Sequence, residues 1–95
     1  MLLSEHLKDP TLLRQQAYIN GAWCNADSGG THDVHNPATG DKIGTIPDMG
    51  AVETRRAIEA AQAAWAGWRK KTAKERSVIL RKWNDLMLAN TDDLA

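Results

Sequence analysis

The chain has 95 residues and a mass of 10.5 kDa; 42% of its residues are hydrophobic, 25% are charged, and twelve basic side chains balance twelve acidic ones. This length allows one domain at most, with a modest core, because such a chain buries only about 60–65% of the surface that its unfolded form exposes. The balanced charge excludes a global field that would draw the chain to nucleic acid or to an anionic membrane.

The sequence also indicates a compartment. No stretch reaches the roughly eighteen apolar residues of a membrane span, and Glu5, Lys8 and Asp9 stand where a signal peptide needs its apolar run. The single Cys24 excludes an internal disulfide, which fits a reducing compartment. We therefore expect a cytoplasmic protein.

Residues 1–17 are predicted to form an N-terminal arm with one short helix. Asp9 is a favourable N-cap, Pro10 suits the first helical position, and Leu12 and Leu13 follow. The stretch "TLLRQQ" should extend this helix to about two turns.

Residues 18–47 are predicted to form a meander of short antiparallel strands. Asn20-Gly21 lies between apolar residues and predicts a type I′ hairpin turn, because both central positions of that turn need a positive φ. Further turn signals lie at 25–30 ("NADSGG") and 36–41 ("NPATGD"). The intervening stretches contain β-branched residues, and Pro47 ends the last one.

Residues 50–95 are predicted to form a hairpin of two antiparallel helices. The apolar face of the first helix follows three-and-four spacing: Thr54, Ala57, Ile58, Ala61, Ala64, Trp65 and Trp68. "TAKE" at 72–75 then predicts a capping box, with Thr72 as N-cap and Glu75 reaching back to it. The apolar stripe of the second helix is Ile79, Leu80, Trp83, Leu86 and Met87, with Leu94 two turns further on. We expect the tryptophans to pack in a core rather than to stack on bases. Two helices and a ribbon can cover these apolar stripes only in part, so some of the apolar surface should stay exposed.

No residue gains a catalytic, cofactor-binding or metal-binding role from its chemistry alone. Cys24 follows Trp23 in a predicted strand with no adjacent base or cation, so a small apolar filler is favoured over a nucleophile. His32 and His35 are three residues apart, which places them on opposite faces of a strand, and solvated loop histidines are favoured over a metal pair. The glycines of 28–30 and 38–44 lack the spacing of a phosphate-binding loop and are read as turns.

The segment 69–82 supports an alternative hypothesis. It carries seven basic residues and one acidic residue, a net charge of +6. A basic helical hairpin can bind phosphates, so the chain could be a stand-alone helical binding module. A solvated surface, or salt bridges to parts outside this sequence, is the favoured explanation for these charges.

The order of the segments is more informative than any single residue. "YINGAW", "NPATGDKIGTIP" and the two helices with their Trp-containing link resemble the start of the aldehyde dehydrogenase superfamily, over about Thr11 to Ala95. "LLRQQAYINGAW" and "WRKKTAKERSVILRKW" look most like its bacterial succinate-semialdehyde dehydrogenases, which act in 4-aminobutyrate breakdown, and their glutarate-semialdehyde relatives.

The resemblance implies an α+β fragment, residues 1–95, that forms the N-terminal part of a Rossmann-like cofactor-binding domain. The family oxidises aldehydes through a cysteine thiolate, a glutamate base and NADP or NAD. Those residues and the dinucleotide site would lie beyond residue 95, so the resemblance implies no catalytic, cofactor-binding or metal site here and an inactive fragment. The implied partners are the remainder of the dehydrogenase chain and, in the full-length enzyme, a second copy in a dimer or tetramer, with no nucleic acid and no membrane. Because no C-cap glycine or polar tail follows Leu94, we expect that the chain is cut.

Overall fold

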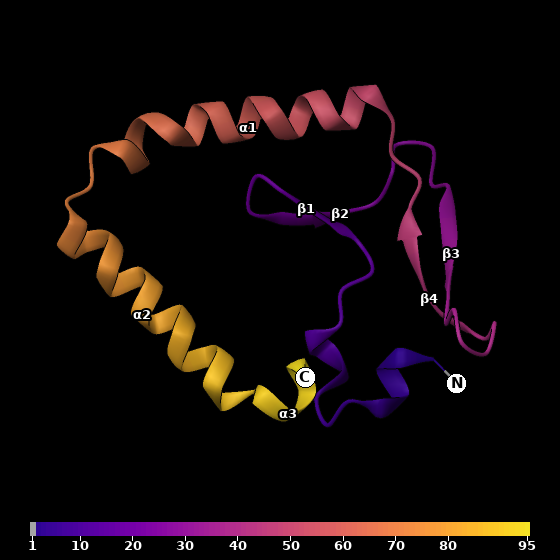
Figure 1. The fold of residues 1–95 in the computed structure, drawn as a ribbon. Coiled ribbons are helices and arrows are strands. Elements are labelled where there is room, and N and C mark those ends of the chain that lie inside the picture. Colours follow the sequence, from indigo (N-terminus) through magenta and orange to yellow (C-terminus); the bar gives the residue numbers. More distant parts are fainter. Residues whose placement is uncertain (1) are drawn as a thin grey trace.

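The computed structural model describes residues 2–95, and its elements form an open α+β frame (Figure 1). Its radius of gyration is 16.8 Å, whereas a compact chain of this length would measure about 12 Å. Its accessible surface is 7630 Å², against about 5,400 Å² for a compact protein of the same mass. Among the described residues, Ala26 is the one buried apolar side chain. The expected core therefore does not form within this chain.

The N-terminal arm contains two short 3₁₀ helices, η1 (Leu3–His6) and η2 (Pro10–Leu12). Asp9 caps η2 as predicted, because its side chain accepts a hydrogen bond from the Thr11 backbone nitrogen. The prediction of two α-helical turns after Pro10 was wrong. Leu13 has extended backbone angles, so the helix ends after a single turn.

The first hairpin joins β1 (Ala17–Ile19) to β2 (Ala22–Cys24) through the predicted turn. Asn20 and Gly21 have φ values of 52° and 77°, which confirms the positive φ that a type I′ turn requires at both positions. Tyr18 pairs with Trp23 across the strands, with ring centroids 5.0 Å apart. This aromatic pair stabilises the register of a very short ribbon.

The second hairpin joins β3 (Thr31–His35) to β4 (Lys42–Pro47) around the loop 36–41. The Gly40 nitrogen donates to the Asn36 carbonyl at 2.7 Å, and Gly40 has a φ of 79°. The two hairpins form two separate two-stranded sheets. The turns of the predicted meander are correct but its continuity was wrong, because β2 and β3 do not pair.

Three helices follow: α1 (Ala51–Arg69), α2 (Ala73–Ala89) and α3 (Thr91–Leu94). The capping box of α2 is confirmed: the Glu75 nitrogen donates to Thr72 Oγ1 at 3.2 Å, and the Thr72 nitrogen donates to Glu75 Oε2 at 3.2 Å. Leu94 does not continue α2 as predicted, because the backbone breaks at Asn90 (φ −118°, ψ 25°). No helix within residues 2–95 is both long and apolar enough to cross a bilayer.

The predicted antiparallel packing of the two long helices was wrong. Figure 1 shows α2 turning away from α1 at the elbow, residues 70–72, so their apolar faces do not meet. Trp65 on α1 is 52% exposed and Trp83 on α2 is 60% exposed, which also contradicts the expected tryptophan core. The reason lies at the elbow. Arg76 Nη2 donates to the carbonyls of Trp68 (3.3 Å) and Arg69 (2.9 Å), and this contact fixes α2 at the end of α1 rather than alongside it.

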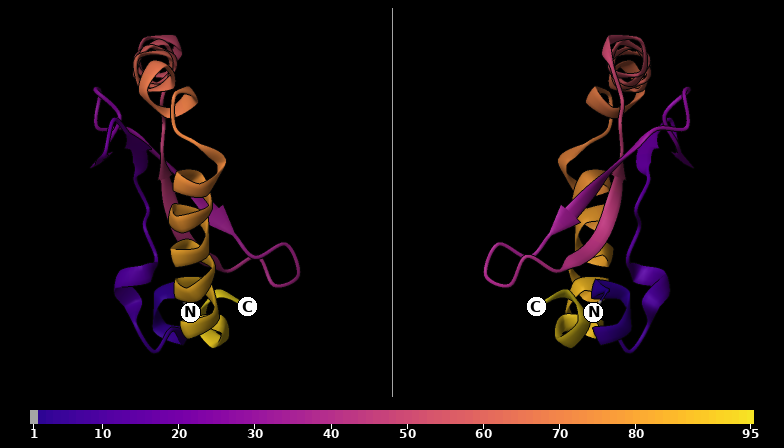
Figure 2. Two further views of the ribbon diagram at one scale, coloured as in Figure 1. Left: turned by 90° about the vertical axis from the view of Figure 1, so that its left-hand side faces the viewer. Right: turned by 90° about the vertical axis from the view of Figure 1, so that its right-hand side faces the viewer.

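The chain closes into a ring at its two ends. The N-terminal arm lies beside α3 in each view (Figure 1 and Figure 2), and three hydrogen bonds join the two segments. β1 packs against α1, and η1 packs against β4. The helices and hairpins therefore hold fixed positions around a frame that has almost no interior.

Candidate functional site

The principal surface feature is the apolar face of α2, which we define as Ile79, Leu80, Trp83, Leu86 and Met87. These side chains lie on one side of the helix at three-and-four spacing, and their exposed fractions are between 41% and 60%. A helix with such a stripe packs it against another layer in a folded domain. Monomeric proteins rarely leave a contiguous apolar patch of more than a few hundred Å² in water. The α2 face is therefore a packing surface without its neighbour among the described residues.

The face of α1 is partly covered. Ala57, Ala60, Ala61 and Ala64 line a shallow hollow of about 290 Å³ together with residues 18–21 of the first hairpin. Small side chains let the hairpin backbone lie close to the helix, which explains why this stripe is rich in alanine. Beside the hairpin, Ile58 is 63% exposed, so the coverage ends there. The hairpin accounts for only part of the apolar surface of α1.

The start of α1 carries the main charge contacts of the frame. Arg56 donates to both carboxylate oxygens of Asp27, at 3.1 and 2.9 Å, which fastens the loop 25–30 to the helix. These hydrogen bonds from Arg56 lower the pKa of Asp27, and the carboxylate in turn raises the pKa of Arg56. This charged pair of hydrogen bonds therefore holds the loop after the first hairpin against α1.

The same helix start does not fit a dinucleotide site, because the strand that precedes it belongs to an antiparallel two-stranded hairpin and the residues around it lack the required chemistry. A pyrophosphate binds where a strand leads into the N-terminus of a helix, and β4 leads into α1 through residues 48–50. Here Glu53 is only 7% exposed, and its carboxylate accepts a hydrogen bond from the Gly50 nitrogen at 3.3 Å. A second anion would meet this like charge. The residues of this helix start therefore do not fit a dinucleotide phosphate.

The structure places the candidate side chains apart from one another. Cys24 lies in β2 as expected; it is half-buried, and its thiol lies 3.5 Å from the Ala17 carbonyl oxygen, to which it donates. His32 and His35 lie in β3, so their assignment to a loop was wrong. His32 is solvated and lies 2.9 Å from Asp48 Oδ1. In the part of the chain that the structure describes, no three His, Cys, Asp or Glu side chains come together as a metal site.

The basic segment 69–82 divides into two parts. Arg76 is half-buried and belongs to the elbow, where its guanidinium lies 5.7 Å from the centroid of the Trp68 ring and donates to two carbonyls. The other basic side chains are exposed: Arg69, Lys70, Lys71, Lys74, Arg81 and Lys82. Sequence reasoning missed the structural use of Arg76. The available signal was its position one turn after a capping residue, beside the carbonyls that end the preceding helix.

Comparison with known proteins gives a consistent result. The model of the aldehyde dehydrogenase family matches residues 23–95. The chain is 64% identical over 89 residues to a glutarate-semialdehyde dehydrogenase of Pseudomonas putida, and 57% identical over 89 residues to an NADP(+) succinate-semialdehyde dehydrogenase of Escherichia coli. The crystal structure of a succinate-semialdehyde dehydrogenase from Burkholderia pseudomallei superimposes with a TM-score of 0.88 at 67% identity. Each match covers 94% of this chain but only 18% of the relative, so the chain spans less than a fifth of the length of these relatives.

Proposed function

The chain belongs to the aldehyde dehydrogenase family, a family of oxidoreductases, and on this premise we propose that it is the N-terminal part of a semialdehyde dehydrogenase. The proposed reaction is the oxidation of succinate semialdehyde to succinate with NADP or NAD, as in 4-aminobutyrate breakdown. Glutarate semialdehyde, one methylene longer, is the second substrate that we propose to test. The complete enzyme would be a cytoplasmic dimer or tetramer.

Within that enzyme, we assign the chain a structural role in a Rossmann-like cofactor domain. The observation that carries this assignment is the exposure of the α2 face, where Trp83 is 60% exposed although it is in phase with four other apolar side chains. Such a surface needs a neighbouring layer, and the remainder of a dehydrogenase chain would supply it. The nucleophile, the base and the cofactor site would come from that remainder, because Cys24 is tied to Ala17 and Glu53 closes the start of α1.

A chimeric enzyme tests this function directly. The matching segment of the Pseudomonas putida glutarate-semialdehyde dehydrogenase is replaced by the aligned residues of this chain, and NADPH or NADH formation is followed with both semialdehydes. We expect turnover within about tenfold of the parent enzyme, because the two segments are 64% identical over 89 residues and cores tolerate substitutions that conserve volume. The 95-residue chain alone should show no turnover.

Two substitutions sharpen the experiment. Trp83→Asp places a charge in the α2 face and should abolish assembly of the chimera, since an unpaired buried charge costs several kcal/mol, of the order of 3–5. Asn84→Asp adds the same charge at the neighbouring position and should leave turnover nearly unchanged. A soluble, folded chimera without turnover, or one that tolerates Trp83→Asp, would overturn the proposal.

A further inference from the structure

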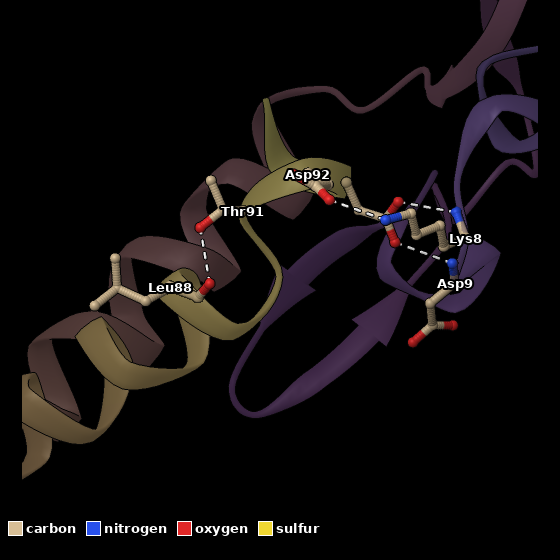
Figure 3. A network of polar contacts seen from close by, with 6 residues as sticks. Lys8, Asp9, Leu88, Thr91 and Asp92 are labelled. Carbon is tan, nitrogen blue, oxygen red and sulfur yellow. Dashed lines mark hydrogen bonds and ion pairs between the residues drawn. The ribbon is translucent and has the colours of Figure 1, made fainter.

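The two ends of the described chain are joined by a polar contact that the proposed function does not use. Asp93 of α3 accepts hydrogen bonds from two consecutive backbone nitrogens of the arm, at 2.8 Å from Lys8 and 3.0 Å from Asp9. Lys8 Nζ also lies 2.9 Å from Asp92 Oδ2. Figure 3 shows these contacts crossing between the arm and the short last helix.

We propose that Asp93 is a latch that fastens the N-terminal arm, residues 2–16, as a detachable strap across the frame. The two oxygens of this one carboxylate satisfy both backbone donors. Their hydrogen bonds also hold the pKa of Asp93 below its usual range, because they stabilise the charged form. The latch depends on the backbone of the arm, whereas the Lys8 side chain contributes only a solvated ion pair in which both partners are more than three-quarters exposed.

The position of Asp93 depends on the break in the helix at Asn90, between α2 and α3. Asn90 Nδ2 donates to the Leu86 carbonyl at 2.9 Å, and Thr91 Oγ1 donates to the Leu88 carbonyl at 2.8 Å. These side chains satisfy the last carbonyls of α2 and end it. The four residues of α3 then lie beside the arm, and Asp92 points toward Lys8 (Figure 3). Asp93 meets the arm through its hydrogen bonds with the nitrogens of Lys8 and Asp9. An uninterrupted α2 would carry Asp93 elsewhere around and along the helix.

A second contact fixes the other end of the strap. The Thr45 nitrogen of β4 donates to Gln15 Oε1 at 2.7 Å. On both sides of the latch, the arm lies over apolar surface: Leu3 and Leu13 line one hollow with Val34, Ile43 and Ile46, and a second hollow with Leu94. The strap thus covers part of β4 and α3, and its release uncovers that surface.

The test compares Asp93→Asn with Asp92→Asn in the chimeric enzyme described above, where the remainder of the dehydrogenase chain would supply the layers that this chain lacks. The two backbone donors bind different oxygens of the Asp93 carboxylate, and an asparagine would place its NH₂ group, itself a donor, opposite one of them. We expect amide hydrogen exchange at Lys8 and Asp9 to become at least about tenfold faster in Asp93→Asn. Trypsin should cut after Lys8 sooner. Asp92→Asn removes only the exposed ion pair and should change exchange at these amides by less than about twofold.

Two further measurements keep the result decisive. Circular dichroism at 222 nm should be the same in all variants, since Asp93 lies outside both long helices. If Asp93→Asn loses helicity, Asp93→Ala is used instead, because it removes both acceptor oxygens and alanine favours helix. Asp93→Glu keeps the carboxylate and should retain most of the protection. Equal protection in Asp93→Asn and the unsubstituted chimera would overturn the proposal, and so would an unsubstituted chimera whose Lys8 and Asp9 amides exchange at unprotected rates.

Discussion

Arg56 and Asp27 show how single residues hold this frame in place of a core. Their two parallel hydrogen bonds join a loop to a helix across 29 positions of sequence. Contacts of short range could be predicted from the sequence: Asp9 on Thr11, Thr72 with Glu75, and the positive φ of Asn20 each depend on residues at most three positions apart. The Asp27 contact, and that of Lys8 with Asp92, could not, because nothing in the local sequence specifies which distant carboxylate a basic side chain will meet.

The Asp27 contact predicts a specific dependence on pH. Arg56 lowers the pKa of Asp27 in the folded chain, so the contact adds stability above the unfolded pKa and loses it as pH falls through the lower, folded pKa. An NMR titration of the Asp27 carboxyl should give a midpoint below that of an ordinary aspartate. In Arg56→Gln the midpoint should return to the ordinary range, while Arg55→Gln, its exposed neighbour, should have no such effect. If the titration midpoint of Asp27 in the parent chain is that of an ordinary aspartate, the two hydrogen bonds from Arg56 to Asp27 do not form in solution.

For helices and strands, the sequence specifies the type of each element better than it specifies the element against which it packs. The helical periods located α1 and α2, and the turn residues located both hairpins, because these signals arise from local backbone preference and side-chain spacing. The pairing of the helices was predicted wrongly. Apolar stripes at 54–68 and 79–87 show that each helix needs a packing partner that excludes water. They do not show whether that partner is the other helix or another part of a larger protein.

The elbow gives a prediction at this scale. Arg76→Met keeps the volume of the side chain but removes the two hydrogen bonds to the end of α1, at a cost of about 1–2 kcal/mol of local stability. Spin labels at Gln62 and Asn84, in a Cys24→Ser background, report the distance between α1 and α2 by pulsed electron paramagnetic resonance. We expect a narrow distance distribution in the parent and a broad one in Arg76→Met. Arg81→Met is the matched control, because this exposed arginine lies outside the elbow. If the distribution of distances between the two labels is unchanged in Arg76→Met, Arg76 does not fix the orientation of α2 relative to α1.

At the level of the whole molecule, the main feature is a large accessible surface, which includes most of the large apolar side chains. Its 7630 Å² of accessible surface exceeds that of a compact protein of equal mass by about 2,000 Å². The sequence indicated this through two apolar stripes that a pair of helices and a ribbon cannot fully cover. It could not show that the helices diverge, which leaves the α2 stripe and part of the α1 stripe exposed. At raised concentration, such faces should associate through Trp65 and Trp83.

The chain forms a frame that needs further layers to complete a core, and calorimetry of the dilute, monomeric 95-residue chain measures whether it has a core of its own. A compact domain of this length would unfold in one sharp transition with an enthalpy of about 65 kcal/mol near 60 °C. We predict a broad transition with much less absorbed heat, whereas circular dichroism should still detect helices at low temperature. A sharp, two-state transition of the full enthalpy in the monomer would instead show that the chain forms its own core and needs no further layer.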